Sequence, residues 1–370
     1  MAESTNISSS SLTTKSPSRS WAGLLVLILS PVLVSLLVYR LDDFDSAPYP
    51  DSALSLDTIF VPKHHGHVLN VTEKLGNGIL SGPEDIAYDS ESRVIYTGCS
   101  DGWIKRLMVT QSVSEVTVEN WVHVGGRPLG LAFGLDKELI VAEPDKGLLK
   151  VTKDGEITLL TDEAEGLRFK LTDGVDIDQS GLIYFTDASY KYSVHDHVLD
   201  IFEGRPYGRL MSFDPSTKQT QYLEYWSAYS LLIFAMGEGV ECITSKARKV
   251  GSVDNFVDSL PGYPDNIRYD GEGKFWIGLT SGRATAGDFI LKNPMMRKII
   301  VILSRYFDVP ITQKDGGVIA VNLNGEVIGL YTDPGLAGVT GGVKIEEHLY
   351  YASLAASYIG RVNVTHTDNV

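Results

Sequence analysis

The sequence predicts an all-β fold, a six-bladed β-propeller preceded by one membrane-spanning helix, and three observations lead to this prediction. A short phrase of turn, strand, turn and strand recurs along the chain. The first three copies are spaced by 44 or 45 residues, and the one long apolar run stands before the first copy. Repeats of about 40–45 residues are typical of propeller blades, which have four strands each.

Each copy of the phrase consists of a Gly/Pro turn, a short apolar strand, a second turn and a second apolar strand. Pro83 and Pro128 are 45 residues apart, and Gly130 and Gly174 are 44 residues apart. The copies run through residues 82–98, 126–142, 172–186 and 262–278, with a weaker fifth copy at 340–352. We therefore expect the propeller to occupy residues 68–370.

An uncharged apolar run at residues 21–39 precedes the propeller. At about 1.5 Å per residue, a helix of this length reaches roughly the 30 Å of a bilayer hydrocarbon core. Basic residues stand before the run and acidic residues follow it, namely Lys15, Arg19, Asp42, Asp43 and Asp45. The positive-inside rule then predicts a cytosolic tail at 1–20, a signal anchor at 21–39, a linker at 40–67 and a lumenal propeller. A cleaved signal peptide is the alternative.

Two glycosylation sequons stand on the predicted lumenal side, at Asn70 and Asn363. They agree with a single-pass protein of the endomembrane system, in the endoplasmic reticulum, the vacuole or the cell surface. Cys99 and Cys242 are the only cysteines, and they either form a disulfide in an oxidising lumen or remain buried free thiols.

Composition indicates a globular domain that does not bind nucleic acid. The net charge of −15 repels phosphate backbones and favours cations near the surface. The sequence has no Walker loop, paired CxxC, HExxH or GxSxG motif, which excludes the commonest nucleotide, zinc and serine-hydrolase sites.

Oxygen-bearing side chains recur just after the turn of the repeat, at Glu84, Asp85, Asp173, Asp265 and Asn266. Because the inner strand of every blade faces one central channel, we expect these side chains to meet at its mouth. Ca²⁺ takes about six to eight oxygen ligands, and carboxylates that share a site repel one another unless a cation or a proton intervenes. The set predicts a divalent-cation site. Alternatively, these residues form only turn hydrogen bonds to their own backbone.

A family resemblance is carried by several segments, among them GPEDIAYD (82–89), VGGRPLGLAFG (124–134), FKLTDGVDID (169–178) and LPGYPDNIRYDGEGKFWIGLTSG (260–282). From about Val68 to Val364 the chain resembles the plant strictosidine synthase-like proteins, which are also similar to animal adipocyte plasma membrane-associated protein. The resemblance implies a six-bladed propeller related at greater distance to paraoxonases and senescence-marker lactonases. Those relatives hold calcium or another divalent ion with Glu and Asn/Asp side chains, and they hydrolyse lactones or esters.

The resemblance assigns roles to single residues. Glu84 matches the metal-binding glutamate of the first blade, and Asp265 with Asn266 matches an Asp-Asn step of a later blade. Asp173 matches, more loosely, a polar residue that faces substrate or ion. Ca²⁺ is the implied cofactor.

Two departures from the family pattern affect this assignment. The family's Asn-Gly-Val turn is missing between Tyr222 and Phe234, so blade four is expected to be truncated. Residues 338–345 align with the stretch that carries the catalytic base of true strictosidine synthases, but they contain no Glu. Since a base must lie within hydrogen-bond reach of the proton it removes, alkaloid synthesis is disfavoured.

Two further segments complete the predicted site. His195 and His197 are candidate catalytic residues in an insert at 189–208 that could cover the channel, with both rings on one face if the segment is extended. Residues 293–307 have a helical pattern and are expected to pack on the propeller or touch the membrane.

The predicted function is metal-dependent hydrolysis of a small-molecule ester or lactone, with Glu84 and Asp265 as the other catalytic candidates. The alternative is a non-catalytic binding or scaffold propeller with a degraded site.

Overall fold

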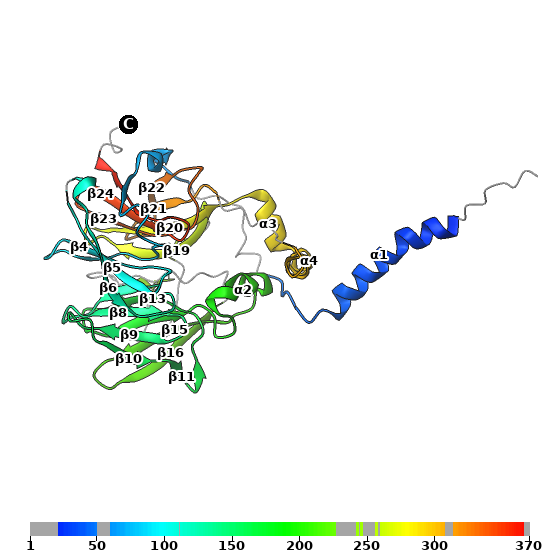
Figure 1. The fold of residues 1–370 in the computed structure, drawn as a ribbon, viewed down its shortest axis with the longest axis horizontal. Coiled ribbons are helices and arrows are strands. Elements are labelled where there is room, and N and C mark those ends of the chain that lie inside the picture. The colour runs from blue at the N-terminus through cyan, green and yellow to red at the C-terminus, as the bar shows by residue number, and fades with distance from the viewer. Residues whose placement is uncertain are drawn as a thin grey trace, which may run out of the picture. The chain divides into compact units, whose positions relative to one another are not determined.

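The protein is described by a computed structural model that covers residues 21–49, 60–110, 112–226, 242–243, 245–246, 256–257, 260–307 and 314–365. The chain divides into two compact units, Met1–Phe44 and Asp45–Val370. The second unit is an all-β propeller, as the sequence predicts (Figure 1).

Five sheets of the propeller are built from antiparallel strands in the described residues, and we name each blade by its innermost strand. The β3 blade contains β3 (Ala87–Asp89), β4 (Val94–Gly98), β5 (Trp103–Met108) and β6 (Val118–His123). The β7 blade contains β7 (Leu131–Phe133), β8 (Leu139–Glu143), β9 (Gly147–Val151) and β10 (Ile157–Thr161). The β13 blade contains β13 (Thr172–Ile177), β14 (Ile183–Asp187), β15 (Gly208–Asp214) and β16 (Gln219–Trp226).

The last two blades lie towards the C-terminal end of the chain. The β19 blade contains β19 (Gly262–Tyr269), β20 (Lys274–Gly282), β21 (Gly317–Asn322) and β22 (Val327–Thr332). The β23 blade contains β23 (Val339–Ile345), β24 (His348–Ser353), β25 (Ile359–Asn363) and, as its outermost strand, β2 (Glu73–Leu75) from the start of the propeller. A short N-terminal strand, β1 (His64–Gly66), pairs in parallel with β22. The N-terminal segment therefore covers the outer edges of two blades, which protects strand edges that would otherwise be open to pairing.

Several short elements lie within or between the blades. They are the 3₁₀ turns η2 (Val68–Val71), η3 (Val113–Glu115) and η4 (Val194–Asp196), and the two-residue strand pairs β11 (Glu163–Ala164) with β12 (Leu167–Arg168) and β17 (Cys242–Ile243) with β18 (Ser245–Lys246).

The prediction of six blades needs correction, because the described residues form five. The expected fourth blade falls on residues 227–261, between β16 and β19. These 35 residues are fewer than the 44 or 45 of one repeat, and the described part of this stretch contains only β17 and β18. The shortened segment predicted between Tyr222 and Phe234 lies largely outside the described residues.

Most of the hydrophobic core in the described residues lies between neighbouring blades, and one further cluster packs Phe256 and Leu260 against the β19 blade. Ile104 of the β3 blade packs with Val141 of the β7 blade, and Ala142 of the β7 blade packs with Phe185 of the β13 blade. Similar clusters join the β19, β23 and β3 blades. The alternating apolar strands of the repeat thus stack face to face, which explains why the sequence pattern predicts the fold.

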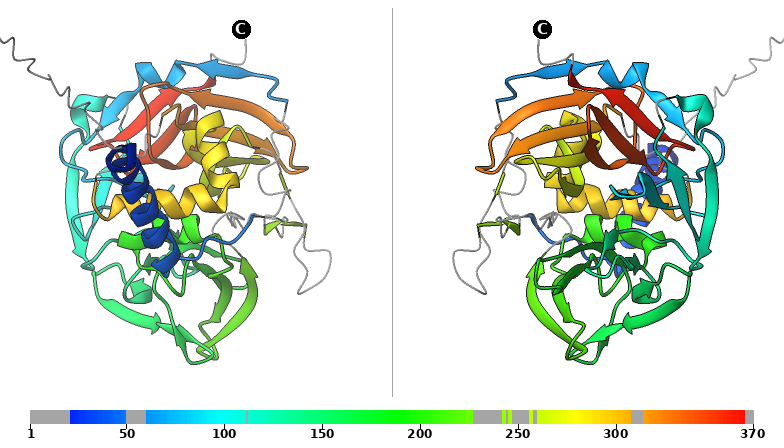
Figure 2. Two further views of the ribbon diagram at one scale, coloured as in Figure 1. Left: turned by 90° about the vertical axis from the view of Figure 1, so that its right-hand side faces the viewer. Right: turned by 90° about the vertical axis from the view of Figure 1, so that its left-hand side faces the viewer.

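Three helices lie over one face of the propeller (Figure 2). They are α2 (His197–Glu203), α3 (Thr285–Lys292) and α4 (Pro294–Ser304), and α2 and α4 pack against each other. The helical pattern predicted at residues 293–307 is confirmed by α4. Helix α2 follows β14, and helix α3 follows β20, so both insertions leave their blades at the end where the inner strand begins.

The first unit contains helix α1 (Trp21–Leu41), which includes the predicted anchor at residues 21–39. In the described part of the chain, no helix is both long and apolar enough to cross a membrane. The predicted cytosolic tail, residues 1–20, lies outside the described residues, as does part of the linker at 40–67.

Candidate functional site

The recurring post-turn residues gather at the end of the propeller that the helices cover. Thr172, beside Asp173, pairs with Asp187 at the end of β14, and Gly262 pairs with Gly282 at the end of β20. The insertions that carry α2 and α3 start directly after these positions. The candidate site is therefore the channel mouth beneath the helices.

Glu84 is buried, with 3% of its surface exposed. Its Oε1 accepts a hydrogen bond of 2.6 Å from Asn266 Nδ2, which joins residues 182 positions apart in the chain. Its Oε2 is buried and has no hydrogen-bond partner in the described structure. The hydroxyl of Thr340 donates to the backbone carbonyl of Glu84 and fixes the turn that carries the side chain. A buried carboxylate oxygen without a donor is costly and points to a missing partner.

Three carboxyl groups lie at the channel mouth, and burial and neighbouring negative charges raise the pKa of each. Burial, followed by the negative charges of Asp85, Asp173 and Asp265, raises the pKa of Glu84 well above its usual value, although the hydrogen bond from Asn266 lowers it. Burial and the charges of Asp173 and Asp85 likewise raise the pKa of Asp265. Burial, with Asp85 and Asp187 next, raises the pKa of Asp173 to about 6, against a lowering effect of Arg127. The structure thus brings Glu84, Asp173 and Asp265 close enough to disfavour one another's charge.

Asp85, by contrast, has hydrogen-bond and ion-pair partners for both of its carboxylate oxygens. One oxygen accepts the backbone N–H of Ile86 at 2.7 Å, and the other accepts the backbone N–H of Leu131 at 2.8 Å. Arg268 forms an ion pair with both oxygens. The sequence prediction grouped Asp85 with the other post-turn carboxylates, and the structure assigns it to an internal ion pair.

Arg268 links the inner strands of several blades across the channel. Besides Asp85, which precedes β3, its guanidinium donates to the carbonyl of Leu131 on β7 at 2.8 Å and to that of Val175 on β13 at 3.2 Å. Arg268 itself belongs to β19. Sequence reasoning missed this residue, although it stands three positions after Asp265 and two after Asn266. The only sequence signal is a single Arg that closely follows the predicted ligands.

The mouth has the donor chemistry for a hard cation. Carboxylate and amide oxygens are the ligands that Ca²⁺ prefers, and the unpartnered Oε2 of Glu84 offers one such atom. Asn266, however, presents its nitrogen to Glu84, and the part of the chain that the structure describes holds no group of three or more His, Cys, Asp or Glu side chains placed to coordinate one ion. The donor types fit a divalent cation, and Glu84 supplies the atom that fits best.

The two histidines of the insert are not brought to the carboxylates by any contact in the described structure. His195 lies in η4 and His197 begins α2, and both are exposed. His197 Nδ1 forms a hydrogen bond of 2.7 Å with the Val194 carbonyl. The segment is helical rather than extended, so the predicted placement of both rings on one face does not hold.

The insert instead carries its own polar cluster, which the sequence did not reveal. Glu203 accepts hydrogen bonds from Lys191 Nζ, from the hydroxyl of Tyr192 and, at 2.6 Å, from the hydroxyl of Tyr207. Nearby, Ser189 donates to the buried Asp200 at 2.8 Å, and burial raises the pKa of Asp200 to about 7. This network fixes α2 over the mouth.

The remaining predicted residues are Cys99 and the two sequon asparagines, Asn70 and Asn363. Cys99 is a free, buried thiol whose pKa burial raises to about 11, so the alternative of a free cysteine holds for it. Asn70 is exposed in η2, and Asn363 accepts hydrogen bonds from the backbone and hydroxyl of Thr365 at the end of β25.

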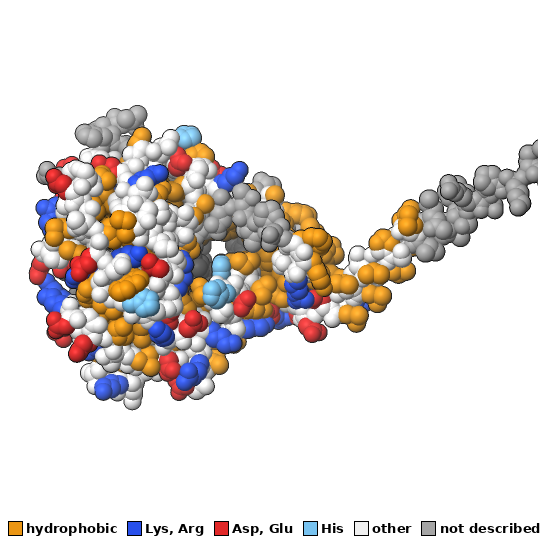
Figure 3. Space-filling view, in the orientation of Figure 1, with side chains coloured by type: hydrophobic (Ala, Val, Ile, Leu, Met, Phe, Trp, Pro, Cys, Tyr) orange, Lys and Arg blue, Asp and Glu red, His pale blue; other side chains and the backbone are white. Residues whose placement is uncertain are grey.

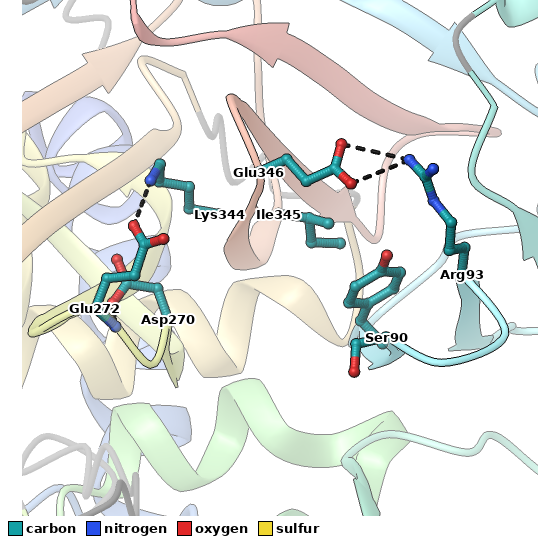
Figure 4. A pocket seen from close by; sticks show the side chains of 8 residues that line it. Ser90, Arg93, Asp270, Glu272, Lys344, Ile345 and Glu346 are labelled. Atoms are coloured by element: carbon teal, nitrogen blue, oxygen red, sulfur yellow. Dashed lines mark hydrogen bonds and ion pairs between the residues drawn. The ribbon is translucent and has the colours of Figure 1, made fainter.

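A pocket of about 360 Å³ opens at the other end of the inner strands (Figure 4). It lies among the hairpins that follow β3, β19 and β23. Its rim is held by two ion pairs, Arg93 with Glu346 at 3.1 Å and Lys344 with Glu272 at 2.6 Å. Because its charges are paired and partly exposed, the pocket lacks the uncompensated carboxylates of the mouth, which we favour as the site.

Solved structures with a similar fold include a gluconolactonase and a calcium-binding protein. A gluconolactonase from Xanthomonas campestris matches with a TM-score of 0.53 and 14% identity, covering 87% of this chain and 95% of its own. The calcium-binding protein regucalcin from Agrobacterium tumefaciens matches with a TM-score of 0.54 and 13% identity, covering 82% and 96%. At these identities the likeness supports the fold alone.

Sequence relatives are much closer. The strictosidine synthase-like N-terminal family model matches residues 68–107, and the strictosidine synthase model matches residues 173–235. Adipocyte plasma membrane-associated protein from Salmo salar is 29% identical over 80% of this chain and 79% of its own length. Protein STRICTOSIDINE SYNTHASE-LIKE 6 from Arabidopsis thaliana is 45% identical over 91% of this chain and 94% of its own length. The chain therefore belongs to the strictosidine synthase-like family.

Proposed function

We propose that the protein is a membrane-anchored hydrolase of small-molecule esters or lactones, and that it uses a divalent cation, Ca²⁺ in the first instance. The observation that carries the proposal is the buried, unpartnered Oε2 of Glu84 at a mouth shared with Asp173 and Asp265. Three mutually repelling carboxyl groups lower the stability of the folded protein, and a bound cation offsets that repulsion.

Glu84, Asp265 and Asn266 would hold the cation, and Asp173 would face the ion or the substrate. A bound divalent cation acts as a Lewis acid that polarises a carbonyl group. The side chains supply the remaining functions. Asp173, whose pKa is about 6, is mostly ionised at pH 7 and can accept a proton from an attacking water. The network around Glu203 holds α2 over the mouth and limits access of bulk water.

Alkaloid synthesis of the strictosidine synthase type is not part of the proposal. The stretch that would carry its base forms β23, and this strand runs beside the candidate site. A Cβ added at Gly341 would lie 3.6 Å from the Asn266 Cβ and 3.8 Å from the Glu84 carbonyl oxygen. The strand is thus in the right place, but it carries no carboxylate.

Lactone and ester chemistry is also supported by the neighbours, since one solved structure of similar fold is named a gluconolactonase and another a calcium-binding regucalcin. The alternative is a non-catalytic binding propeller. It is favoured by the hydrogen bond through which Asn266 already engages Glu84, and by the presence of five blades in the described residues where six were predicted.

The decisive experiment measures cation binding and turnover on the same protein. The full-length protein is stripped with EGTA, and its Tm is followed during Ca²⁺ titration; binding at 100 times Kd adds about 2.7 kcal/mol to the free energy of unfolding. Aryl esters and lactones are then tested as substrates. Glu84→Gln should abolish the Ca²⁺ response and the turnover, and Glu346→Gln, a change of the same kind at an exposed carboxylate, should retain both. A wild-type protein that shows neither response would favour the binding propeller.

Membrane anchoring through residues 21–39, with the propeller in the lumen, belongs to the same proposal. It is supported by the flanking charges and by the similarity to a protein named as plasma membrane-associated. Sodium carbonate washing of microsomes should leave the protein in the membrane fraction. Endoglycosidase treatment should lower its mass, and the shift should disappear in the Asn70→Gln, Asn363→Gln double variant. Digestion of the propeller by protease added outside sealed microsomes would show that the propeller faces the cytosol.

A further inference from the structure

An exposed apolar surface covers α3, α4 and the turn after α4 (Figure 3). Its large apolar side chains are well exposed: Phe289 59%, Met295 58%, Leu303 44%, Tyr306 72% and Phe307 66%. The opposite side of α4 is buried through Arg297, Val301 and Ile302. We call residues 285–307 the helical cap. Soluble proteins rarely expose so many large apolar side chains together on their surface, so this surface indicates an interaction site.

The helical cap is basic, although the whole chain carries a net charge of −15. Lys292 and Arg305 are exposed, and Lys298 is partly exposed. Asp288 is the only acidic residue of the cap, and it is buried in contact with Tyr263 and Arg283. Apolar side chains flanked by basic ones, without exposed acidic groups, are the composition that suits an anionic lipid surface.

The chain between α1 and the helical cap is short and tightly held. Ala47 donates its N–H to the Glu203 carbonyl at 2.8 Å and accepts a hydrogen bond from Arg297 of α4. The Arg297 guanidinium also lies 4.3 Å from the centre of the Tyr49 ring. Helix α1 ends at Leu41, six residues before Ala47, and six extended residues span at most about 20 Å. A bilayer that contains α1 is therefore within reach of the helical cap.

We propose that the helical cap docks on the membrane surface, so that Phe289, Met295 and Leu303 contact lipid and the channel mouth faces the bilayer. The proposal rests on the membrane anchoring of the previous subsection. It commits to lipid because both the charge of the cap and the short tether favour that occupant. Helices that lie in an interface bury their apolar face about 5–10 Å into the headgroup and acyl boundary.

Site-specific fluorescence tests the docking on the full-length protein in liposomes of phosphatidylcholine and phosphatidylserine. In a Cys242→Ser background, a cysteine is placed at position 289 or 295 and labelled with an environment-sensitive dye; Cys99 is buried and its raised pKa keeps it unreactive. Leu159→Cys is the matched control, because Leu159 is an apolar residue of similar exposure (52%) on β10. Ser90→Cys, beside the pocket at the opposite end of the channel, controls for orientation.

The emission of labels at 289 and 295 should be blue-shifted, and doxyl lipids should quench it about two-fold or more. A docked interfacial helix places these labels at the boundary between headgroups and acyl chains. Labels at 159 and 90 should be quenched by aqueous iodide and not by doxyl lipids. Equal behaviour of all four labels in a protein that resists carbonate extraction would overturn the docking while leaving the anchor intact. Protection of 289 and 295 from both quenchers would also overturn it, because another protein segment then covers the cap. Extraction by carbonate would overturn the anchor and the docking together. If a Phe289 variant fails to fold, Leu303→Cys replaces it.

Discussion

The channel mouth around Glu84 and the channel interior around Asp85 are lined by consecutive residues of one turn, yet they differ in charge balance. Asp85 accepts two backbone N–H groups and pairs with Arg268. Glu84 receives one hydrogen bond, from Asn266, and keeps a second oxygen without a partner in the described structure. Both side chains are buried, so burial alone does not separate a structural carboxylate from a functional one.

The difference between the two regions lies in compensation. A buried charge with a full set of partners is tolerated, whereas several carboxylates without a counter-ion raise one another's pKa. The interior pair joins blades that are distant in sequence and belongs to the fold. The carboxylates at the mouth disfavour one another's negative charge. The mouth is therefore the better candidate for binding a ligand that carries positive charge.

The largest expected effect comes from removing the counter-ion of the interior. Arg268→Met should lower the free energy of unfolding by about 3–5 kcal/mol, because it leaves Asp85 buried without its cation and removes two donors to blade carbonyls. Denaturant unfolding followed by far-UV circular dichroism measures this loss.

A double variant provides the control for Arg268. Asp85→Asn together with Arg268→Met removes both charges, so it should recover a large share of the lost stability. An Arg268→Met protein as stable as the wild type would show that the pair does not hold the inner strands.

A change of opposite sign is expected at the mouth. In cation-free buffer at pH 7, Glu84→Gln should raise the free energy of unfolding, because the substitution removes a carboxyl group whose charge is disfavoured by burial and by its neighbours. Thermal unfolding in EGTA measures the difference. A destabilised Glu84→Gln protein would show that the carboxyl group is structural, like that of Asp85.

The pH dependence of stability should separate the two regions further. The pKa of Asp173 is about 6 in the folded protein, above its ordinary 3.8. The folded state therefore binds the proton more tightly than the unfolded state, and stability falls as the pH rises from about 4 to about 6. Asp173→Asn should flatten this part of the profile and raise the Tm at pH 7, by roughly 2–4 °C for each 1 kcal/mol of penalty removed in domains of 150–250 residues. Excess Ca²⁺ should restore the wild-type Tm at pH 7; an unchanged profile in Asp173→Asn would assign the dependence to other groups.

Much of the propeller follows from local sequence pattern. Alternating apolar strands and turn residues define each blade, and their spacing shows that the blades repeat. Within the first blade, for example, the apolar residues Ile95 and Leu107 pair on neighbouring strands. The count of blades was predicted less well, because it depends on residues 227–261, where the repeat is too short. Sequence also does not show that β2 completes the last blade, since that pairing joins Glu73 to Arg361 across almost the whole propeller.

The candidate site was predicted as a set of carboxylates that meet at the channel mouth, but their individual hydrogen bonds and ion pairs were not predicted. Glu84, Asp173 and Asp265 stand at equivalent places in the repeat, and equivalent places converge on one axis. Asp85 shares that place in the sequence, and only the three-dimensional path of Arg268 shows that it belongs to a different group. The helical backbone of the insert was not predicted, because two histidines alone do not indicate it, and a catalytic role for His195 and His197 stays a prediction.

The smallest expected effect concerns the pocket at the opposite end of the channel, and it decides between the two ends. Arg93→Ala breaks the ion pair with Glu346, in which the two side chains are 52% and 63% exposed. Such exposed pairs contribute about 0–1 kcal/mol, so the Tm should change little, and the Ca²⁺ response and any ester or lactone turnover should remain at the wild-type level. The measurement is the same titration and assay that is applied to Glu84→Gln. If Arg93→Ala loses turnover while Glu84→Gln retains it, the pocket shown in Figure 4 rather than the carboxylate mouth is the reactive site, because the paired charges of its rim would then orient the substrate.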